Sequence, residues 1–112
     1  MGKEKMVQLN GIYVKIFPTQ EIILAYRNMR IRVVSDIYDD IIIYYRPGKN
    51  LKKLVKYFED FHVPYSKVGR EIEVIYEPWY FNVSDIKDLI EKLKEEDFLD
   101  WFLDNIIPPF IL

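Results

Sequence analysis

The sequence predicts an α+β fold in which two or three helices pack on one face of a single, mainly antiparallel sheet. In the first half of the chain, apolar and polar residues alternate with the two-residue period of strands. In the second half, two segments carry apolar residues three and four positions apart, as amphipathic helices do, and a hairpin pattern lies between them. The expected order is a β-rich half followed by helix, hairpin, helix and a final helix.

The N-terminal half is predicted to consist mainly of strands. Strands are expected over residues 6–17, with a bulge or bend at Gly11, and over residues 29–34. A further strand, Ile41–Arg46, has little polarity on either face, which predicts a central position in the sheet. Residues 35–40 are rich in aspartate and are expected to form a turn.

Residues 19–28 allow two interpretations, and the choice between them decides the topology. As a helix capped by Thr19, they would give the βαββαβ order of a ferredoxin-like fold. Nine helical residues rise only about 13–14 Å, whereas a crossover between parallel strands of about six residues must span about 20 Å. A strand within a meander is therefore favoured.

The C-terminal half is predicted to form helix, hairpin and helix. Asn50 is expected to cap a helix over residues 51–61, and Ser84 to cap a second helix, in which Asp85 suits the positive N-terminal end. Residues 63–76 between them have the pattern of a hairpin with a Gly-Arg turn. The side chains expected to face the core are Leu51, Leu54, Val55 and Phe58 in the first helix, and Ile86, Leu89, Ile90 and Leu93 in the second.

Residues 97–112 form an apolar and acidic C-terminal helix and tail. Asp97, Asp100 and Asp104 are the only charges, and their spacing aligns them in one narrow stripe. The rest of the helix must be covered, either by folding back into the core or by docking another molecule. Docking is favoured because the apolar surface exceeds what a small domain is expected to hide. The interface residues predicted on this basis are Phe98, Trp101, Phe102, Ile106 and Phe110.

Composition and length predict one domain over residues 1–112. The chain has no cysteine, which excludes disulfides and thiolate metal sites. No apolar run approaches the roughly 20 residues of a membrane span, and the first residues lack a signal-peptide pattern, so a cytoplasmic protein is expected. Abundant Ile, Lys and Glu with few Ala and Gln favour a hyperthermophile, of archaeal or archaeal-virus type.

Charge is unevenly distributed along the chain. All 16 lysines and arginines precede residue 95, and five of the 18 acids follow residue 94. One acid-free segment carries a basic stripe that predicts a nucleic-acid or anion site, with a solvated helix face as the plainer alternative. Its residues are Arg46, Lys49, Lys52, Lys53 and Lys56, and Arg27, Arg30 and Arg32 extend the stripe if their strand lies alongside.

No catalytic, cofactor or metal motif stands out. His62 is the only histidine, and no second positioned group accompanies it in the sequence. Asp36, Asp39 and Asp40 lack the alternating pattern of a cation-binding loop and are explained by turn formation. We therefore expect no cofactor and no catalytic residues.

These patterns favour a non-catalytic protein-interaction or regulatory module, acting as a homodimer or as a subunit or inhibitor of a larger complex. Trp79, Tyr80 and Phe81 give a second aromatic patch or, alternatively, a lid over the core. A nucleic-acid-binding domain that uses the basic helix face is the first alternative function. A small enzyme of unknown substrate is the second.

Overall fold

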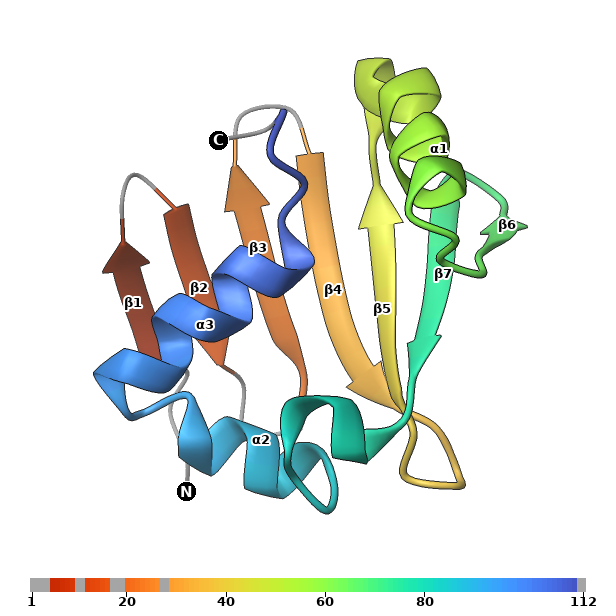
Figure 1. The fold of residues 1–112 in the computed structure, drawn as a ribbon. Coiled ribbons are helices and arrows are strands. Elements are labelled where there is room, and N and C mark those ends of the chain that lie inside the picture. The colour runs from red at the N-terminus through yellow and green to blue at the C-terminus, as the bar shows by residue number, and fades with distance from the viewer. Residues whose placement is uncertain (1–4, 10–11, 17–19, 27–28, 111–112) are drawn as a thin grey trace.

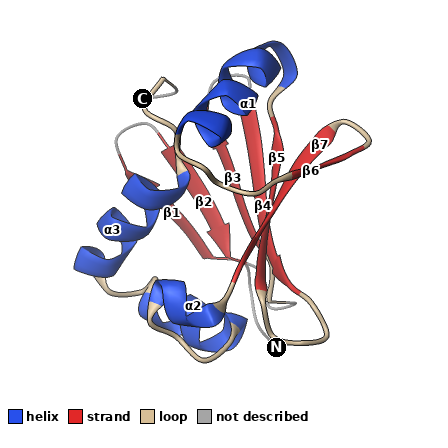
Figure 2. Ribbon diagram, turned by 45° about the vertical axis from the view of Figure 1, so that its right-hand side comes forward, coloured by secondary structure: helices blue, strands red, loops and turns tan. Residues whose placement is uncertain are grey.

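One antiparallel sheet runs through the computed structural model, which describes residues 5–9, 12–16, 20–26 and 29–110. Seven strands lie in the order β1-β2-β3-β4-β5-β7-β6, and each neighbouring pair is antiparallel. The three α-helices cover one face of this sheet (Figures 1 and 2). This arrangement confirms the predicted α+β class; the ferredoxin-like alternative is not found.

The first five strands form a meander. They are β1 (Lys5–Leu9), β2 (Ile12–Ile16), β3 (Ile22–Tyr26), β4 (Met29–Ser35) and β5 (Ile41–Arg46). The strand favoured within residues 19–28 is therefore confirmed as β3, and β5 is central, between β4 and β7.

The single strand predicted over residues 6–17 is wrong, because this segment forms two antiparallel strands, with Val7 opposite Val14. Folding back satisfies backbone hydrogen-bonding groups that one long edge strand would leave unpaired. Gly11, the predicted bend, lies outside the described residues.

The second half of the chain adds two strands to the sheet on the side of β5 opposite β4. A 3-10 turn, η1 (Gly48–Asn50), leads into α1 (Leu51–Asp60), and a hairpin of β6 (Ser66–Val68) and β7 (Glu71–Tyr76) then pairs with β5. The remaining elements are η2 (Pro78–Phe81), α2 (Ile86–Lys92) and α3 (Glu96–Ile106). The predicted order of helix, hairpin, helix and helix is confirmed.

The helix caps differ from their predictions. Asn50 makes no side-chain capping hydrogen bond, because η1 runs directly into α1 and leaves Asn50 with φ −89° and ψ 9° rather than an extended backbone. Asp85, not Ser84, caps α2, and its carboxylate accepts a hydrogen bond from the backbone N–H of Asp88 at 2.8 Å. Ser84 instead donates from its own N–H to the Asp88 carboxylate at 3.0 Å.

Tyr45 connects the central strand to two helices. Its side chain is fully buried, and its hydroxyl donates a hydrogen bond of 3.0 Å to the carbonyl oxygen of Ile106 in the last turn of α3. Its ring packs edge-to-face on Phe58 of α1, with 5.2 Å between ring centres. Burial raises the pKa of Tyr45 well above its usual value, and burial also raises the pKa of the neighbouring Tyr76 to about 12.

We expect Tyr45→Phe to lower the free energy of unfolding by about 1–3 kcal/mol, because the Ile106 carbonyl loses its buried donor. Urea denaturation measures this change. Tyr38→Phe, at a 76% exposed loop position, is the matched control and should change stability by less than about 0.5 kcal/mol. Equal, small effects of both substitutions would contradict the assigned role of Tyr45.

Alkaline pH should destabilise the fold. A tyrosine whose pKa is higher in the folded state stabilises the fold fully below the unfolded pKa, about 10, and this contribution is lost as pH rises toward 12. Thermal melts from pH 9 to 12 should therefore show a steep fall in Tm. In Tyr76→Phe the fall should be shallower, and an identical slope would count against the buried-tyrosine explanation.

Candidate functional site

Helix α3 is divided between core and surface. Leu99, Phe102, Leu103 and Ile106 are buried, whereas the Trp101 side chain is 39% exposed. In Figure 1 the helix lies over the N-terminal strands, whose number is one larger than the sequence predicted. The wider sheet hides apolar surface that was expected to need a second molecule. Most of α3 therefore folds back into the core, which was the alternative to docking another molecule.

The structure places some of the predicted interface residues of α3 and the tail in the core and others at the surface. Phe102 and Ile106 are corrected to core positions, since their side chains are 0% and 2% exposed and face the sheet. Phe110 is half-buried against Tyr57, with ring centres 6.3 Å apart. Phe98 is half-buried and packs against the core, and Trp101 stays at the surface.

An aromatic surface forms where α3 meets η2, and we define it by Trp79, Tyr80, Phe98 and Trp101. Ring centres are 6.4 Å apart for Trp79 and Tyr80, 6.4 Å for Tyr80 and Trp101, and 5.4 Å for Phe98 and Trp101. The two tryptophans are 71% and 39% exposed and Tyr80 is 37% exposed. The two aromatic segments that were predicted separately therefore form one surface.

Phe81 fixes this surface to the core. It is completely buried and contacts Trp101 and Phe102 edge-on or tilted, with ring centres 5.9 Å and 5.5 Å away. Of the segment 79–81, Phe81 is thus the predicted core lid, while Trp79 and Tyr80 face outward. Because a 3-10 turn has three residues per turn, consecutive side chains of η2 point about 120° apart, so Phe81 can face the core while Trp79 and Tyr80 face outward.

Acidic residues surround the aromatic surface. Asp97, Asp100 and Asp104 are exposed along α3, and Glu77 accepts a hydrogen bond from the indole N–H of Trp79. No basic residue lies in the last turn of α3, although the negative end of a helix favours cations. Lys92 provides a nearby cation, with its ammonium 5.7 Å from the centre of the Phe98 ring. The surface therefore combines exposed aromatic rings with a mainly acidic rim.

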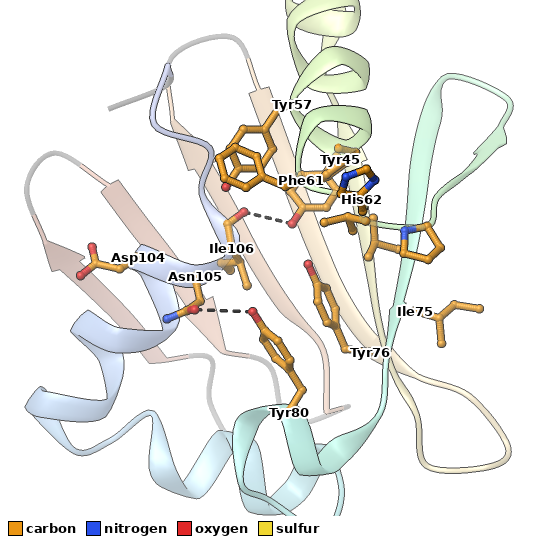
Figure 3. A pocket seen from close by; sticks show the side chains of 14 residues that line it. Tyr45, Tyr57, Phe61, His62, Ile75, Tyr76, Tyr80, Asp104, Asn105 and Ile106 are labelled. Atoms are coloured by element: carbon orange, nitrogen blue, oxygen red, sulfur yellow. Dashed lines mark hydrogen bonds between the residues drawn. The ribbon is translucent and has the colours of Figure 1, made fainter.

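A half-open hollow of about 380 Å³ adjoins this surface (Figure 3). It lies between the end of α1, β7, η2 and the end of α3, and tyrosine rings form much of its lining. Tyr80 bridges the hollow and the aromatic surface, with its hydroxyl 3.5 Å from Asn105 Oδ1. The hollow is thus a neighbour of the aromatic surface, lined mainly by aromatic carbon and phenolic hydroxyls.

His62 lies at the rim of this hollow. It follows the C-cap of α1 with φ 55°, its backbone N–H donates to the Glu59 carbonyl at 3.2 Å, and its side chain is exposed. Asp104 lines the same hollow but lies on the opposite side in Figure 3 and points away from the imidazole. Among the described residues, no group of three His, Asp or Glu side chains is placed to hold a metal ion.

The residues of the predicted basic stripe lie on two different faces of the protein. Lys49, Lys52, Lys53 and Lys56 are exposed on η1 and α1, and Lys56 pairs with Asp60 at 2.7 Å. By strand alternation from the buried Tyr45, Arg46 belongs instead to the sheet face that the helices leave open. Arg30 and Arg32 of β4 share that open face, and Arg27 lies outside the described residues.

The aspartates predicted to form a turn do so. The Asp36 carboxylate accepts hydrogen bonds from the backbone N–H groups of Tyr38 and Asp40, at 2.8 and 3.0 Å. Asp39 adopts the left-handed conformation, with φ 63°. Turn formation thus accounts for Asp36 and Asp39 without a bound cation.

Comparison with known proteins gives one informative match. No family model matches the sequence, and no solved structure matches it. The uncharacterized protein ORF111 of Acidianus two-tailed virus is 35% identical over 104 residues, which cover 88% of this chain and 93% of the viral protein. The chain belongs to the ORF111 family.

The ORF111 relative comes from an archaeal virus, which is consistent with the archaeal-virus type predicted from composition. Its description assigns no activity. None of the helices in the described part of the chain is long and apolar enough to cross a bilayer.

Reversing charges at the two ends of α3 should have opposite effects on stability. Asp104→Lys places a cation at the C-terminal end and should raise Tm by about 2–5 °C, whereas Asp97→Lys at the N-terminal end should lower it by a similar amount. Thermal melts at low ionic strength measure both. A stabilising effect of both variants would show that net charge, rather than the helix dipole, decides the outcome.

Proposed function

We propose that this protein is a protein-interaction module that docks a basic partner protein through the aromatic surface. The observation that carries the proposal is the cluster of two tryptophans and a tyrosine, all exposed and in contact, beside a core that is already complete. Trp and Tyr are the side chains most enriched among interface hot spots. Contiguous exposed aromatic surface on a small protein commonly marks a binding site.

The acidic rim supports a partner of opposite charge. Asp97, Asp100 and Asp104 would face the partner's rim, where complementary charges accelerate encounter and select against wrong partners. A two-fold dimer through this surface would place the same acids of both copies near each other. The charge distribution therefore favours a different, basic protein over a second copy of this chain.

The aromatic surface is held in position before binding. Trp101 rests on the buried Phe81, and Tyr80 packs on Tyr76 with ring centres 4.8 Å apart. A rigid set of rings loses little conformational entropy when a partner binds, which increases the affinity gained per contact. This supports docking of a preformed partner surface over a mechanism in which the site folds on binding.

A binding comparison tests the proposal. Proteins captured by the wild-type chain from a host-cell extract would be identified, purified, and titrated against wild type and a Trp79→Gln/Trp101→Gln variant. We expect the double variant to bind a purified partner at least about 30-fold more weakly, as loss of about 2 kcal/mol at a hot spot implies.

The matched control is Ile37→Gln/Tyr38→Gln, which removes two exposed large side chains from the β4–β5 turn. It should bind like wild type, and an Asp100→Lys/Asp104→Lys variant should bind more weakly at low salt. Equal affinity of wild type and the tryptophan variant for every purified partner would refute the proposal.

A further inference from the structure

The second sheet face is not covered by any described helix (Figure 2). Its central strands carry arginines at alternate positions: Arg30 and Arg32 on β4, and Arg46 on β5. The strand register places Arg30 directly opposite Arg46. Like charges directly opposite each other on neighbouring strands destabilise a sheet, so this pair is unfavourable for the isolated chain.

Only one of these three arginines is paired with carboxylates of the described residues. Arg32 lies 3.4 Å from the Glu71 carboxylate and 4.0 Å from that of Glu21, and its guanidinium stacks over the Tyr44 ring at 4.4 Å. Arg30 and Arg46 are exposed and form no ion pair with any residue that the structure describes. Two adjacent guanidinium groups are therefore available to an external anion.

The β6–β7 turn adds a third exposed arginine. Arg70 lines a hollow of about 460 Å³ together with Arg30, Arg32 and Arg46, and Glu71 is the one acid in its lining. Gly69 beside it has φ 61°, and a Cβ added there would meet nothing within 4 Å, so the approach to this turn is open.

A second hollow continues the first around the edge of the sheet. It has a volume of about 450 Å³, shares Arg46, Gly69, Arg70 and Glu71 with the first, and extends to Lys67 and Gly48. Because they share these residues, we treat the two hollows as one trough, which the described residues line with five cations and one carboxylate, and one of the five, Arg32, also pairs with Glu21. Among the residues that the structure describes, no aromatic side chain lines either hollow.

We propose that this trough binds the sugar-phosphate backbone of a nucleic-acid duplex. Guanidinium groups bind phosphate oxygens in a planar, two-point geometry, and an elongated trough fits an extended polyanion better than a single small anion. Because no ring in the trough can stack on an unpaired base, contact with the backbone of a duplex is favoured over binding to a single strand. Recognition is then independent of base sequence.

This site differs from the predicted basic helix face, because it keeps Arg46 and the predicted extension Arg30 and Arg32 but none of the α1 lysines. It is also independent of the aromatic surface, which lies on the helical side of the sheet (Figure 1). Failure of either proposal therefore leaves the other intact.

Fluorescence anisotropy with a labelled DNA duplex of about 20 base pairs tests the trough. Wild type should bind at about 50 mM salt, and its affinity should fall with salt at a logarithmic slope of about −0.9 per phosphate neutralised. Arg30→Gln/Arg46→Gln/Arg70→Gln should bind about 30-fold or more weakly, with a slope shallower by about 2–3. A single strand of the same length should bind more weakly than the duplex.

The matched control is Lys52→Gln/Lys53→Gln/Lys56→Gln, which removes the same charge from α1 and should keep affinity within about three-fold of wild type. The triple arginine variant should melt at the same temperature as wild type or higher, because it removes the repulsion between Arg30 and Arg46, and lost binding would then not reflect lost folding. Absence of duplex binding at low salt, equal loss in the lysine variant, or tighter binding of polyglutamate than of DNA would each overturn the proposal. The last result would assign the trough to an acidic protein.

Discussion

The hydrogen bond from Tyr45 to the Ile106 carbonyl is the constraint on which the arrangement of this protein depends. It joins the centre of the sheet to the end of the last helix, 61 positions away in sequence. The same ring packs on Phe58, so α1 and α3 are positioned by one side chain. Because α3 is fixed at its C-terminal end, Trp101 is held against Phe81 and beside Tyr80.

The two candidate surfaces differ in charge. Acids surround the aromatic surface on the helical side, whereas unpaired arginines gather on the open side. The formal net charge of −2 does not reveal this difference, since it sums all 16 basic and 18 acidic residues. Each side carries a feature that costs the isolated chain stability: acids near the C-terminal end of α3, and the Arg30–Arg46 pair across β4 and β5. Such local conflicts are expected where a surface is selected for binding rather than for folding.

Much of the fold could be predicted because local patterns agree with the tertiary structure. Strands β3 and β4 alternate between a buried and a more open face, β5 is apolar on both faces as a central strand should be, and α1 and α2 have regular apolar stripes. The division of residues 6–17 was missed, although Asn10-Gly11, which lies between β1 and β2 in sequence, is a dipeptide typical of hairpins. That error reduced the expected width of the sheet, so Phe102 and Ile106 were assigned to an interface instead of the core.

The candidate sites depended on information that a single sequence does not contain. Trp79 and Trp101 were both singled out, but only the packing of η2 against α3 shows that they share one surface. The opposition of Arg30 and Arg46 requires the strand register. Arg70 was treated as a turn residue, and its place beside the other arginines follows from the pairing of β7 with β5.

The thinness of the molecule has a further consequence. Its shortest dimension is 25 Å, because a single layer of helices lies on a single sheet. Ligands held on the two sides would be separated by little more than this distance, without blocking each other. A small two-layer protein can thus act as a tether that keeps a polyanion and a cationic protein at millimolar effective concentration relative to each other.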